Sequence, residues 1–269
     1  MKRETVLHVS ALKIGINGRQ IVSDVEFSIA FGERVCLLGA SGSGKSMTAA
    51  AILGLAPPLA TCSGSVRIKG REVLNVRVPQ RTSDTRLAMV FQDTHSALNP
   101  LISIGSQLEQ PLRIHCGLTV AAARQASREL LASIGLPPTD DFLRSSAAEI
   151  SGGQRQRVCI ALALACRADL IVADEPTTAL DVVAQAQVLD VLNRVTGGSE
   201  GPGLLLITHD ISAASRVCER AIVLADGRIV EEGTIDEVLN RPHHPFTCDL
   251  VDCAFDAFHI LPAEERPKC

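Results

Sequence analysis

A glycine-rich stretch, GASGSGKS, lies between a short apolar run and a helix-like segment in the first fifth of the chain. The run before it is RVCLLG (34–39), and the segment after it begins SMTAAAILGL. Glycines let backbone N–H groups close around phosphate oxygens, and a helix N-terminus adds unpaired N–H groups and a partial positive charge. The spacing G-x-x-x-x-G-K-[ST] therefore predicts a P-loop, a phosphate-binding turn that joins a buried strand to a helix.

This motif also predicts how a nucleotide would be held. We expect Lys45 to reach the β- and γ-phosphates and Ser46 to give its hydroxyl to Mg²⁺. The alternative, a glycine-rich turn that only resembles a P-loop, is disfavoured by the strand before it and the helix after it. The residues expected to bind the nucleotide here are Gly39, Ala40, Ser41, Gly42, Ser43, Gly44, Lys45, Ser46 and Met47.

Further apolar runs predict an α/β fold. LIVAD (170–174) and LLLITH (204–209) show no alternation of apolar and polar residues, which is typical of strands buried on both faces of a parallel sheet. Helix-like stretches such as QRVCIALALA separate them. The first thirty residues and SGSVRIKGREV alternate more, which indicates an antiparallel sheet, and Asp226-Gly227 predicts a hairpin between two strand-like runs.

The buried-strand pattern is missing from about residue 93 to 148, where prolines interrupt helix-like segments. We therefore predict a helical subdomain at about 93–159, inserted into a core formed by 1–92 and 160–246. The last residues, 247–269, are expected to be a short C-terminal tail.

Two carboxylates end the run LIVADEP. At the tip of a buried strand, Asp174 is suited to hold Mg²⁺, and Glu175 is suited to act as the general base toward water. The alternative is a pair of residues that cap the next helix, which an intact P-loop makes less favourable. His209 and Gln92 each follow a strand-like run, and neither would indicate a site without the other motifs.

Composition narrows the classes of partner. The net charge of −4, the pI near 6.0 and the absence of Tyr and Trp give no basic surface and no stacking platform for nucleic acid, so no nucleic-acid partner is expected. The N-terminus lacks the apolar segment of a signal peptide, and no apolar run approaches the length of a membrane span. The nine cysteines form no C-x-x-C pair, so we expect reduced packing residues rather than a metal site.

A second glycine-containing stretch, EISGGQRQRV (149–158), precedes another helix-like segment and forms a second potential anion site. Taken together and in this order, the P-loop, FQD with Gln92, SGGQ, ADEPTTALD and THD with His209 resemble the ATP-binding cassette (ABC) ATPases. The resemblance extends from about residue 6 to 246. It implies the ABC form of the P-loop NTPase fold, with an N-terminal antiparallel β subdomain and an inserted helical subdomain.

The resemblance also implies roles for individual residues. In that family, Lys45 and Glu175 belong to the hydrolytic machinery and His209 contacts the γ-phosphate. The resemblance implies Mg²⁺ ligands at Ser46, Gln92 and Asp174. Asp181 falls in the D-loop at the dimer interface. The signature residues Ser151, Gly152, Gly153 and Gln154 close over the ATP that is bound to the opposite subunit.

One position departs from the family pattern. The family usually places an aromatic residue under the adenine in the segment that here is LKIGINGRQ, and Ile16 is the matching residue. An aliphatic side chain covers one purine face but lacks the aromatic stacking contribution of about 0.5–1.5 kcal/mol. We therefore expect the chain to bind ATP, with weaker discrimination between bases than is usual in the family.

SALNPLISIG (96–105), RPHHPFTCDLV (241–251) and ADEPTTALDVVAQAQVLDVL (173–192) resemble the importers of oligopeptides, dipeptides and nickel. Because the chain ends soon after HPFT, it looks closest to the short first ATPase subunit of nickel-type importers. This implies a second ATPase subunit, like or paralogous, two transmembrane permeases and, indirectly, an extracytoplasmic solute-binding protein. It also implies a peripheral location at the cytoplasmic face of the inner membrane.

Three other functions stay open from sequence. The first is a soluble ABC ATPase of DNA repair or translation, although no second cassette, coiled-coil insertion or zinc module is visible. The second is a regulatory subunit that binds ATP without hydrolysing it, which the presence of Lys45, Glu175 and His209 disfavours. The third is an exporter subunit, which the LNP and HPF features disfavour.

Overall fold

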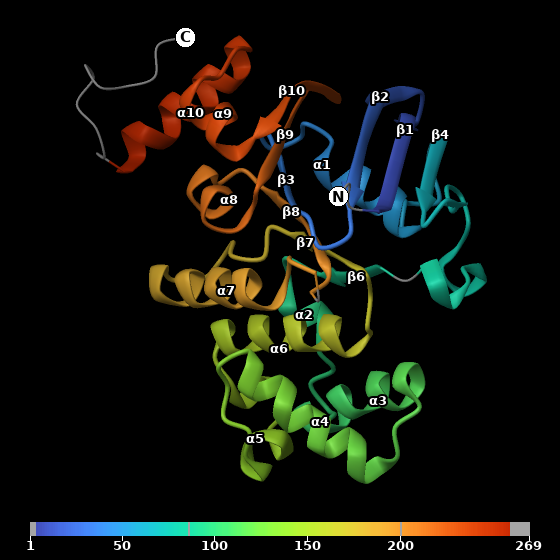
Figure 1. Cartoon of the computed structure of the whole chain (residues 1–269), viewed down its shortest axis with the longest axis vertical. Coiled ribbons are helices and arrows are strands. Elements are labelled where there is room, and N and C mark those ends of the chain that lie inside the picture. The colour runs from blue at the N-terminus through green and yellow to red at the C-terminus, as the bar shows by residue number, and fades with distance from the viewer. Residues whose placement is uncertain (1–3, 86, 200, 259–269) are drawn as a thin grey trace.

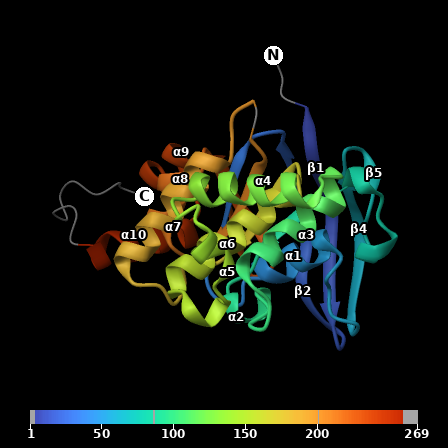
Figure 2. The same ribbon diagram turned by 90° about the horizontal axis from the view of Figure 1, so that it is seen from below.

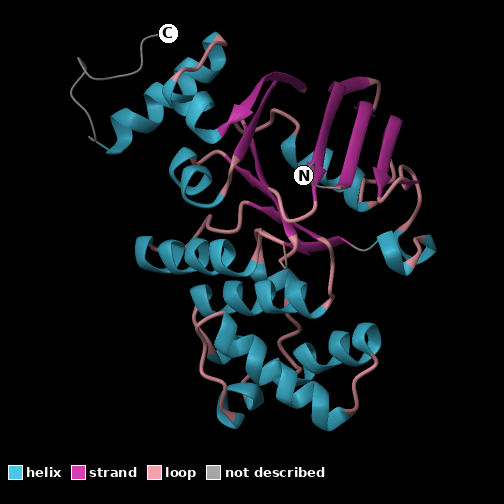
Figure 3. Ribbon diagram, viewed as in Figure 1, coloured by secondary structure: helices cyan, strands magenta, loops and turns pink. Residues whose placement is uncertain are grey.

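The computed structural model describes residues 4–85, 87–199 and 201–258. In it, an antiparallel sheet stands beside a core sheet flanked by helices, and a group of helices forms the opposite end of the molecule along its long axis (Figure 1). Strands are confined to the first two of these parts, and α3, α4 and α5 occupy the far end (Figure 3). None of the described helices combines the length and the hydropathy needed to cross a membrane.

The antiparallel sheet has the strand order β2-β1-β4-β5. Its strands are β1 Thr5–Ile16, β2 Arg19–Ala30, β4 Ala60–Ile68 and β5 Arg71–Glu72. Alternate residues of β1 and β2 are buried against the core, as the alternation in sequence predicted. The expected antiparallel sheet is confirmed.

The core sheet has the order β10-β9-β3-β8-β7-β6, and every neighbouring pair is parallel except β9 and β10. Its strands are β3 Arg34–Leu38, β6 Leu87–Val90, β7 Leu170–Asp174, β8 Gly203–Thr208, β9 Arg220–Ala225 and β10 Arg228–Thr234. The three apolar runs became β3, β7 and β8, whose residues are almost all buried. Because β3, β6, β7 and β8 are parallel, their carboxyl ends share one edge of the sheet, and the residues that follow them can meet there.

Helices cover this sheet and form the far end of the molecule. They are α1 Lys45–Leu53, α2 Thr94–Ala97, α3 Ile104–Cys116, α4 Val120–Ser133, α5 Asp140–Arg144, α6 Gly152–Ala165, α7 Val182–Val195, α8 Ile211–Val217, α9 Ile235–Asn240 and α10 Pro245–Phe258, with 3₁₀ turns η1 Val78–Gln80, η2 Ser83–Thr85 and η3 Ala147–Glu149. Seen from below, α4 lies across α6 and α3 lies beside it (Figure 2). Hydroxyl side chains start the helices of this end: Ser103, Thr119 and Thr139 each accept a bond from a first-turn N–H.

Three details differ from the sequence-based description. The boundary placed near residue 159 falls inside α6, because this helix packs on α3 and α4 with one face and on α7 with another. Pro111 lies within α3 instead of between helices. The segment described as a tail begins with a helix, α10, in which Thr247, Cys248 and Val251 are buried.

The cysteines of the described residues are free thiols at seven positions, as expected. Cys248 is the exception, because it is disulfide-bonded, so the expectation of reduced thiols is wrong at this position. No group of three or more potential metal-binding side chains occurs among the described residues, and His243 and His244 engage Glu231 through their backbone N–H groups instead.

The predicted hairpin at Asp226-Gly227 joins β9 to β10 and also holds other parts of the molecule. The Ser23 N–H donates to the Gly227 carbonyl at 2.7 Å, and the Gly227 N–H donates to the Ser43 carbonyl at 3.0 Å. Gly227 has φ +74°, and a Cβ there would meet the Ile21 carbonyl oxygen at 2.2 Å. This turn therefore fixes β2 and the P-loop at once, and only a glycine allows so close an approach.

Gly227→Ala is expected to lower the free energy of unfolding by about 3 kcal/mol or more, because a clash adds to the backbone strain. Gly18→Ala is the matched control, since Gly18 has φ +77° but no atom within 4 Å of the added Cβ. Strain alone should cost about 1–2 kcal/mol at this position. Urea unfolding of both variants measures the difference, and equal losses would contradict the tight contact with β2.

Candidate functional site

Lys45 is the first residue of α1 and is only 5% exposed. Its Nζ donates to the carbonyl oxygens of Gly39 and Ala40, both at 2.8 Å. Burial lowers the pKa of Lys45, and the nearby charges of Glu175 and Asp174 act in the opposite direction. The ammonium group is thus held inside the loop by carbonyl oxygens, and it is oriented before any ligand arrives.

The P-loop itself is shaped by close approaches of the backbone. A Cβ at Gly39 would meet the Leu224 carbonyl oxygen at 2.3 Å, and Gly44 has φ +104° just before α1. Ser43 carries a buried hydroxyl that has no hydrogen-bond partner among the described residues. A buried polar group without a partner is uncommon, and together with the N-terminus of α1, whose first N–H groups have no partner within a helix, it fits the binding of a polar ligand such as a phosphate.

The carboxyl end of β7 brings an acid to this loop. The Ser46 hydroxyl donates to Asp174 Oδ1 at 3.2 Å, so two of the three predicted Mg²⁺ ligands are in contact. Burial raises the pKa of Asp174, and the neighbouring Glu175 adds to this effect. A divalent cation would neutralise this half-buried carboxylate and favour its ionised form, so the oxygen donors fit a magnesium site.

Glu175 is held by its backbone and by both of its carboxylate oxygens. It has φ +44°, and its N–H donates to the Ile207 carbonyl at 2.9 Å. His209, which follows β8, places Nδ1 3.1 Å from Oε1, and the Thr178 hydroxyl donates to Oε2 at 2.9 Å. Burial alone would raise the pKa of Glu175, but the bonds from His209 and Thr178 and the charge of Lys45 outweigh it and lower the pKa. The carboxylate is therefore ionised and fixed in orientation.

A cavity of about 350 Å³ opens beside the loop. The residues that line it come from β1, β2, the P-loop, α1 and the end of β7; they are Ile16, Ile21, Ser41, Gly42, Gly44, Lys45, Ser46, Met47 and Glu175. The structure thus brings Ile16 to the P-loop, where the resemblance placed the adenine contact. The apolar side chains of Ile16, Ile21 and Met47 face the same space as the polar atoms of the loop.

Gln92 lies two residues beyond β6 and is exposed. It is not among the described residues that line this cavity. The preceding residue is held by α6, because the buried Gln156 on that helix donates through Nε2 to the Phe91 carbonyl at 3.3 Å. The loop that carries Gln92 is thereby tied to the helix that begins with the signature residues.

Ser151 is the N-cap of α6. Its Oγ accepts from the Gln154 N–H at 3.3 Å, and Gln154 Oε1 accepts from the Ser151 N–H at 2.8 Å. A Cβ at Gly153 would lie 2.9 Å from the Ala184 Cβ, whereas a Cβ at Gly152 would make an ordinary contact with Leu180. Small residues therefore let α6 and α7 approach each other closely at their N-termini.

Asp181 is the N-cap of α7, where Oδ1 accepts from the Ala184 N–H at 2.8 Å. The D-loop and the signature residues thus form one surface, which also carries the exposed Val182 and Val183. In the described part of the chain, none of the signature residues lines the cavity at the P-loop. The two predicted anion sites are separate within one chain.

Sequence reasoning missed three residues of this region. Thr178 orients Glu175, and its position three residues after the acid was the available signal. Gln156 is a buried amide on an otherwise apolar helix face, which could have indicated a structural hydrogen bond. Ile21 lines the cavity from β2, and no feature of the sequence distinguished it from other strand residues.

Comparisons with known proteins agree with this geometry. The model of the family described as "ABC transporter" matches residues 22–178, more than half of the chain. A putative peptide import ATP-binding protein of Brucella melitensis is 37% identical over 93% of this chain and 78% of its own. The oligopeptide transport ATP-binding protein OppD of Salmonella typhimurium is 38% identical over 86% of this chain and 69% of its own length. The probable D,D-dipeptide transport ATP-binding protein DdpD of Escherichia coli is 39% identical over 98% of this chain and 82% of its own length.

Among solved structures, the chain is similar to the ATP-binding cassette MJ0796, described as a dimer in a post-hydrolysis state bound to ADP and Pi. The TM-score is 0.72 and the sequence identity 29%, with 85% of this chain and 98% of the other covered. The match of the family model and the identities over most of each relative show that this chain belongs to the ABC transporter family, as an ATPase.

Proposed function

We propose that the chain is the ATPase subunit of a peptide importer and that Glu175 is its general base. The observation that carries the catalytic role is the position of Glu175, between Lys45 of the P-loop and His209, with both carboxylate oxygens held. An ionised and oriented carboxylate next to a phosphate-binding loop is suited to take a proton from an attacking water. The chain hydrolyses ATP, as other ABC ATPases do.

Each group of the site has a proposed part in this reaction. The P-loop N–H groups and Lys45 Nζ bind and orient the phosphates. Glu175 accepts the proton of the water at a carboxylate oxygen, and His209 contacts the γ-phosphate. Ser46, Asp174 and Gln92 would hold Mg²⁺, which when bound neutralises charge on the phosphate oxygens.

The solute class follows from the relatives. Their names assign one of them to the import of peptides and the other two to the transport of oligopeptides or dipeptides, which supports a peptide as the solute of this system. A nickel complex is the other class that the sequence resemblance implied. Uptake by vesicles that contain the permeases, with a labelled di- or tripeptide and with nickel as competing probes, distinguishes the two.

The proposed assembly contains a second ATPase subunit, two permeases and an extracytoplasmic solute-binding protein. The surface formed by SGGQ and the D-loop, on which Ser151 and Asp181 are exposed, supports pairing of two ATPase subunits, as does the dimeric state of MJ0796. The permeases would hold the chain at the cytoplasmic face of the inner membrane. In this arrangement, the signature of one subunit completes the ATP site of the other.

Glu175→Gln is expected to lower the turnover of ATP by about 10²–10⁴-fold, because the amide cannot accept the proton. Binding of ATP, measured by equilibrium titration, should stay close to that of the unmodified chain, since the P-loop is unchanged. Glu26→Gln is the matched control, as Glu26 is exposed on β2. Unchanged turnover in Glu175→Gln would contradict the role as base and favour a subunit that binds ATP without hydrolysing it.

Thr178→Val is expected to move the acidic limb of the kcat profile to higher pH. The hydrogen bond from Thr178 favours the ionised form of Glu175, so its loss raises the pKa of Glu175. A higher pH is then needed to ionise the base. Thr178→Ser keeps the hydroxyl and should restore the original profile. If the Val and Ser variants give the same profile, the hydrogen bond does not set the pKa of the base.

Mixing two inactive variants tests whether the signature acts on the partner's site. Ser151→Ala and Glu175→Gln chains should each be nearly inactive alone. If each site uses the base of one chain and the signature of the other, mixed dimers contain one intact site, and mixing should restore about a quarter of the original turnover. Turnover by the unmodified chain alone is the positive control, because it shows that like chains assemble. No recovery on mixing would mean that Ser151 serves its own chain's site.

A further inference from the structure

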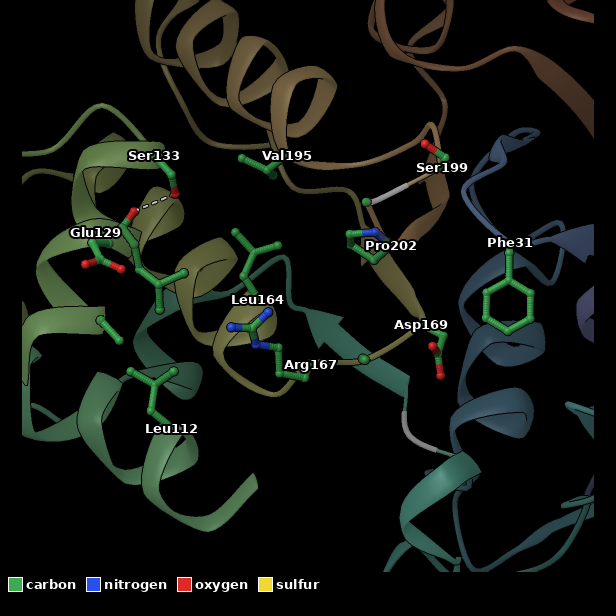
Figure 4. A pocket seen from close by; sticks show the side chains of 14 residues that line it. Phe31, Leu112, Glu129, Ser133, Leu164, Arg167, Asp169, Val195, Ser199 and Pro202 are labelled. Carbon is green, nitrogen blue, oxygen red and sulfur yellow. Dashed lines mark hydrogen bonds between the residues drawn. The ribbon is translucent and has the colours of Figure 1, made fainter. Parts of the chain in front are cut away.

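A second cavity, of about 580 Å³, lies away from the P-loop (Figure 4). One wall comes from α3 and α4, and the other comes from the end of α6 and from the loops that lead into β7 and β8. The catalytic residues follow the carboxyl ends of β3, β7 and β8, whereas this cavity lies at the amino-terminal ends of β7 and β8. The cavity is therefore separate from the nucleotide site, and it joins the helical end of the molecule to the core.

Half-buried apolar side chains form much of the lining. Leu130, Leu164 and Val195 pack with one side against the main core cluster. Leu112 is a buried member of a smaller cluster on α3, α4 and α6, and Leu130 also packs against that cluster. The cavity is thus the gap between two apolar clusters. Side chains that face such a gap lack partner atoms on one side, so an apolar group that fills it gains contacts and leaves water.

Two exposed side chains of opposite charge, Glu129 and Arg167, lie on this cavity. Glu129 accepts only a neutral hydrogen bond, from Gln125 Nε2 at 3.1 Å, and neither Glu129 nor Arg167 has an ion-pair partner among the described residues. Asp169 on the same cavity differs, because Lys69 pairs with it at 2.5 Å. Figure 4 shows Glu129 on one side, Asp169 on the other, and Arg167 near Leu164 between them.

Arg167 carries a long side chain at a backbone position with positive φ, which most residues avoid. Arg167 follows the C-cap of α6 with φ +51°, and its N–H donates to the Leu164 carbonyl at 3.0 Å. Glycine is the usual residue at this left-handed position, because a Cβ is unfavourable there. The chain thus carries a guanidinium, without an ion-pair partner in the described part of the chain, at a site where the backbone alone would favour glycine.

We propose that this cavity binds a small zwitterion with an apolar body, such as a short peptide with leucine-like side chains. The guanidinium of Arg167 receives the carboxylate, for which its planar pair of N–H donors is suited. The carboxylate of Glu129 receives the ammonium group, and the side chains of the ligand fill the apolar gap. The volume is in the range usual for small-molecule sites.

A ligand in this cavity would contact α4 and the core at the same time. Its binding therefore links the helical subdomain to the part of the chain that holds the nucleotide. In a peptide importer, delivered cargo could in this way act on the ATPase, and this regulatory step rests on the proposed function, whereas the binding step does not.

Titration calorimetry of the full chain with L-leucyl-L-leucine, without nucleotide, tests the binding step. We expect saturable binding that weakens about tenfold or more in Arg167→Gly and in Glu129→Gln, which corresponds to the loss of one charge-assisted contact each. Glycine suits the backbone at 167, so the thermal midpoint of Arg167→Gly should not fall. Glu26→Gln is the control for the change of charge.

Blocked dipeptides assign the two charges. Arg167→Gly should have no effect on binding of the C-terminal amide, and Glu129→Gln should have none on the N-acetyl form. Absence of saturable binding in the millimolar range, or equal binding of the free and blocked dipeptides, would overturn the proposal. ATP turnover measured without peptide separates this proposal from the proposed function. Normal turnover without dipeptide binding would reject only the peptide site in this cavity. Normal dipeptide binding without turnover would reject only the proposed catalytic function.

Discussion

The turn at Asp226-Gly227 connects the parts of this molecule that must be fixed relative to one another. It closes the hairpin between β9 and β10, accepts a hydrogen bond from Ser23 on β2 and donates one to Ser43 in the P-loop. The Ile21 carbonyl lies so close that no Cβ fits. Ile16 and Ile21 of the antiparallel sheet line the P-loop cavity, and Ile21 lies on β2 next to this turn. The contact between the two sheets thus determines the shape of the nucleotide site.

Within that site, burial and charge act against each other. Burial disfavours the charged forms of both Lys45 and Asp174, and each of them is stabilised by the opposite charge of the other. Burial also acts to raise the pKa of Glu175, but the pKa is lowered because His209 and Thr178 donate to its two oxygens. The acid that is suited to hold a cation and the acid that is suited to accept a proton are neighbours in sequence. They differ because only one of them has two side-chain donors.

Much of this arrangement was predictable from sequence because it depends on local patterns. Buried strands β3, β7 and β8 were recognisable as unbroken apolar runs, and the P-loop, Glu175 and His209 follow them directly. Since parallel strands end at one edge, the motifs had to meet there. The boundary of the helical subdomain was less predictable, because α6 is apolar on the faces that contact both parts. The contacts of Gly227 with β2 and of Gln156 with Phe91 join residues far apart in sequence, and no local pattern indicates them.

The same topology separates the two cavities. Ligands of an open α/β sheet usually bind at the carboxyl edge, where loops carry the polar groups that the strands do not need. Here the opposite edge also carries charged side chains, because the segment between the end of α6 and the start of β7 contains Arg167 and Asp169. α6 begins at the signature Ser151 and ends at the second cavity, so one rigid helix spans both sites. The residues that flank its two ends therefore belong to two different sites, one at the signature and one at the second cavity.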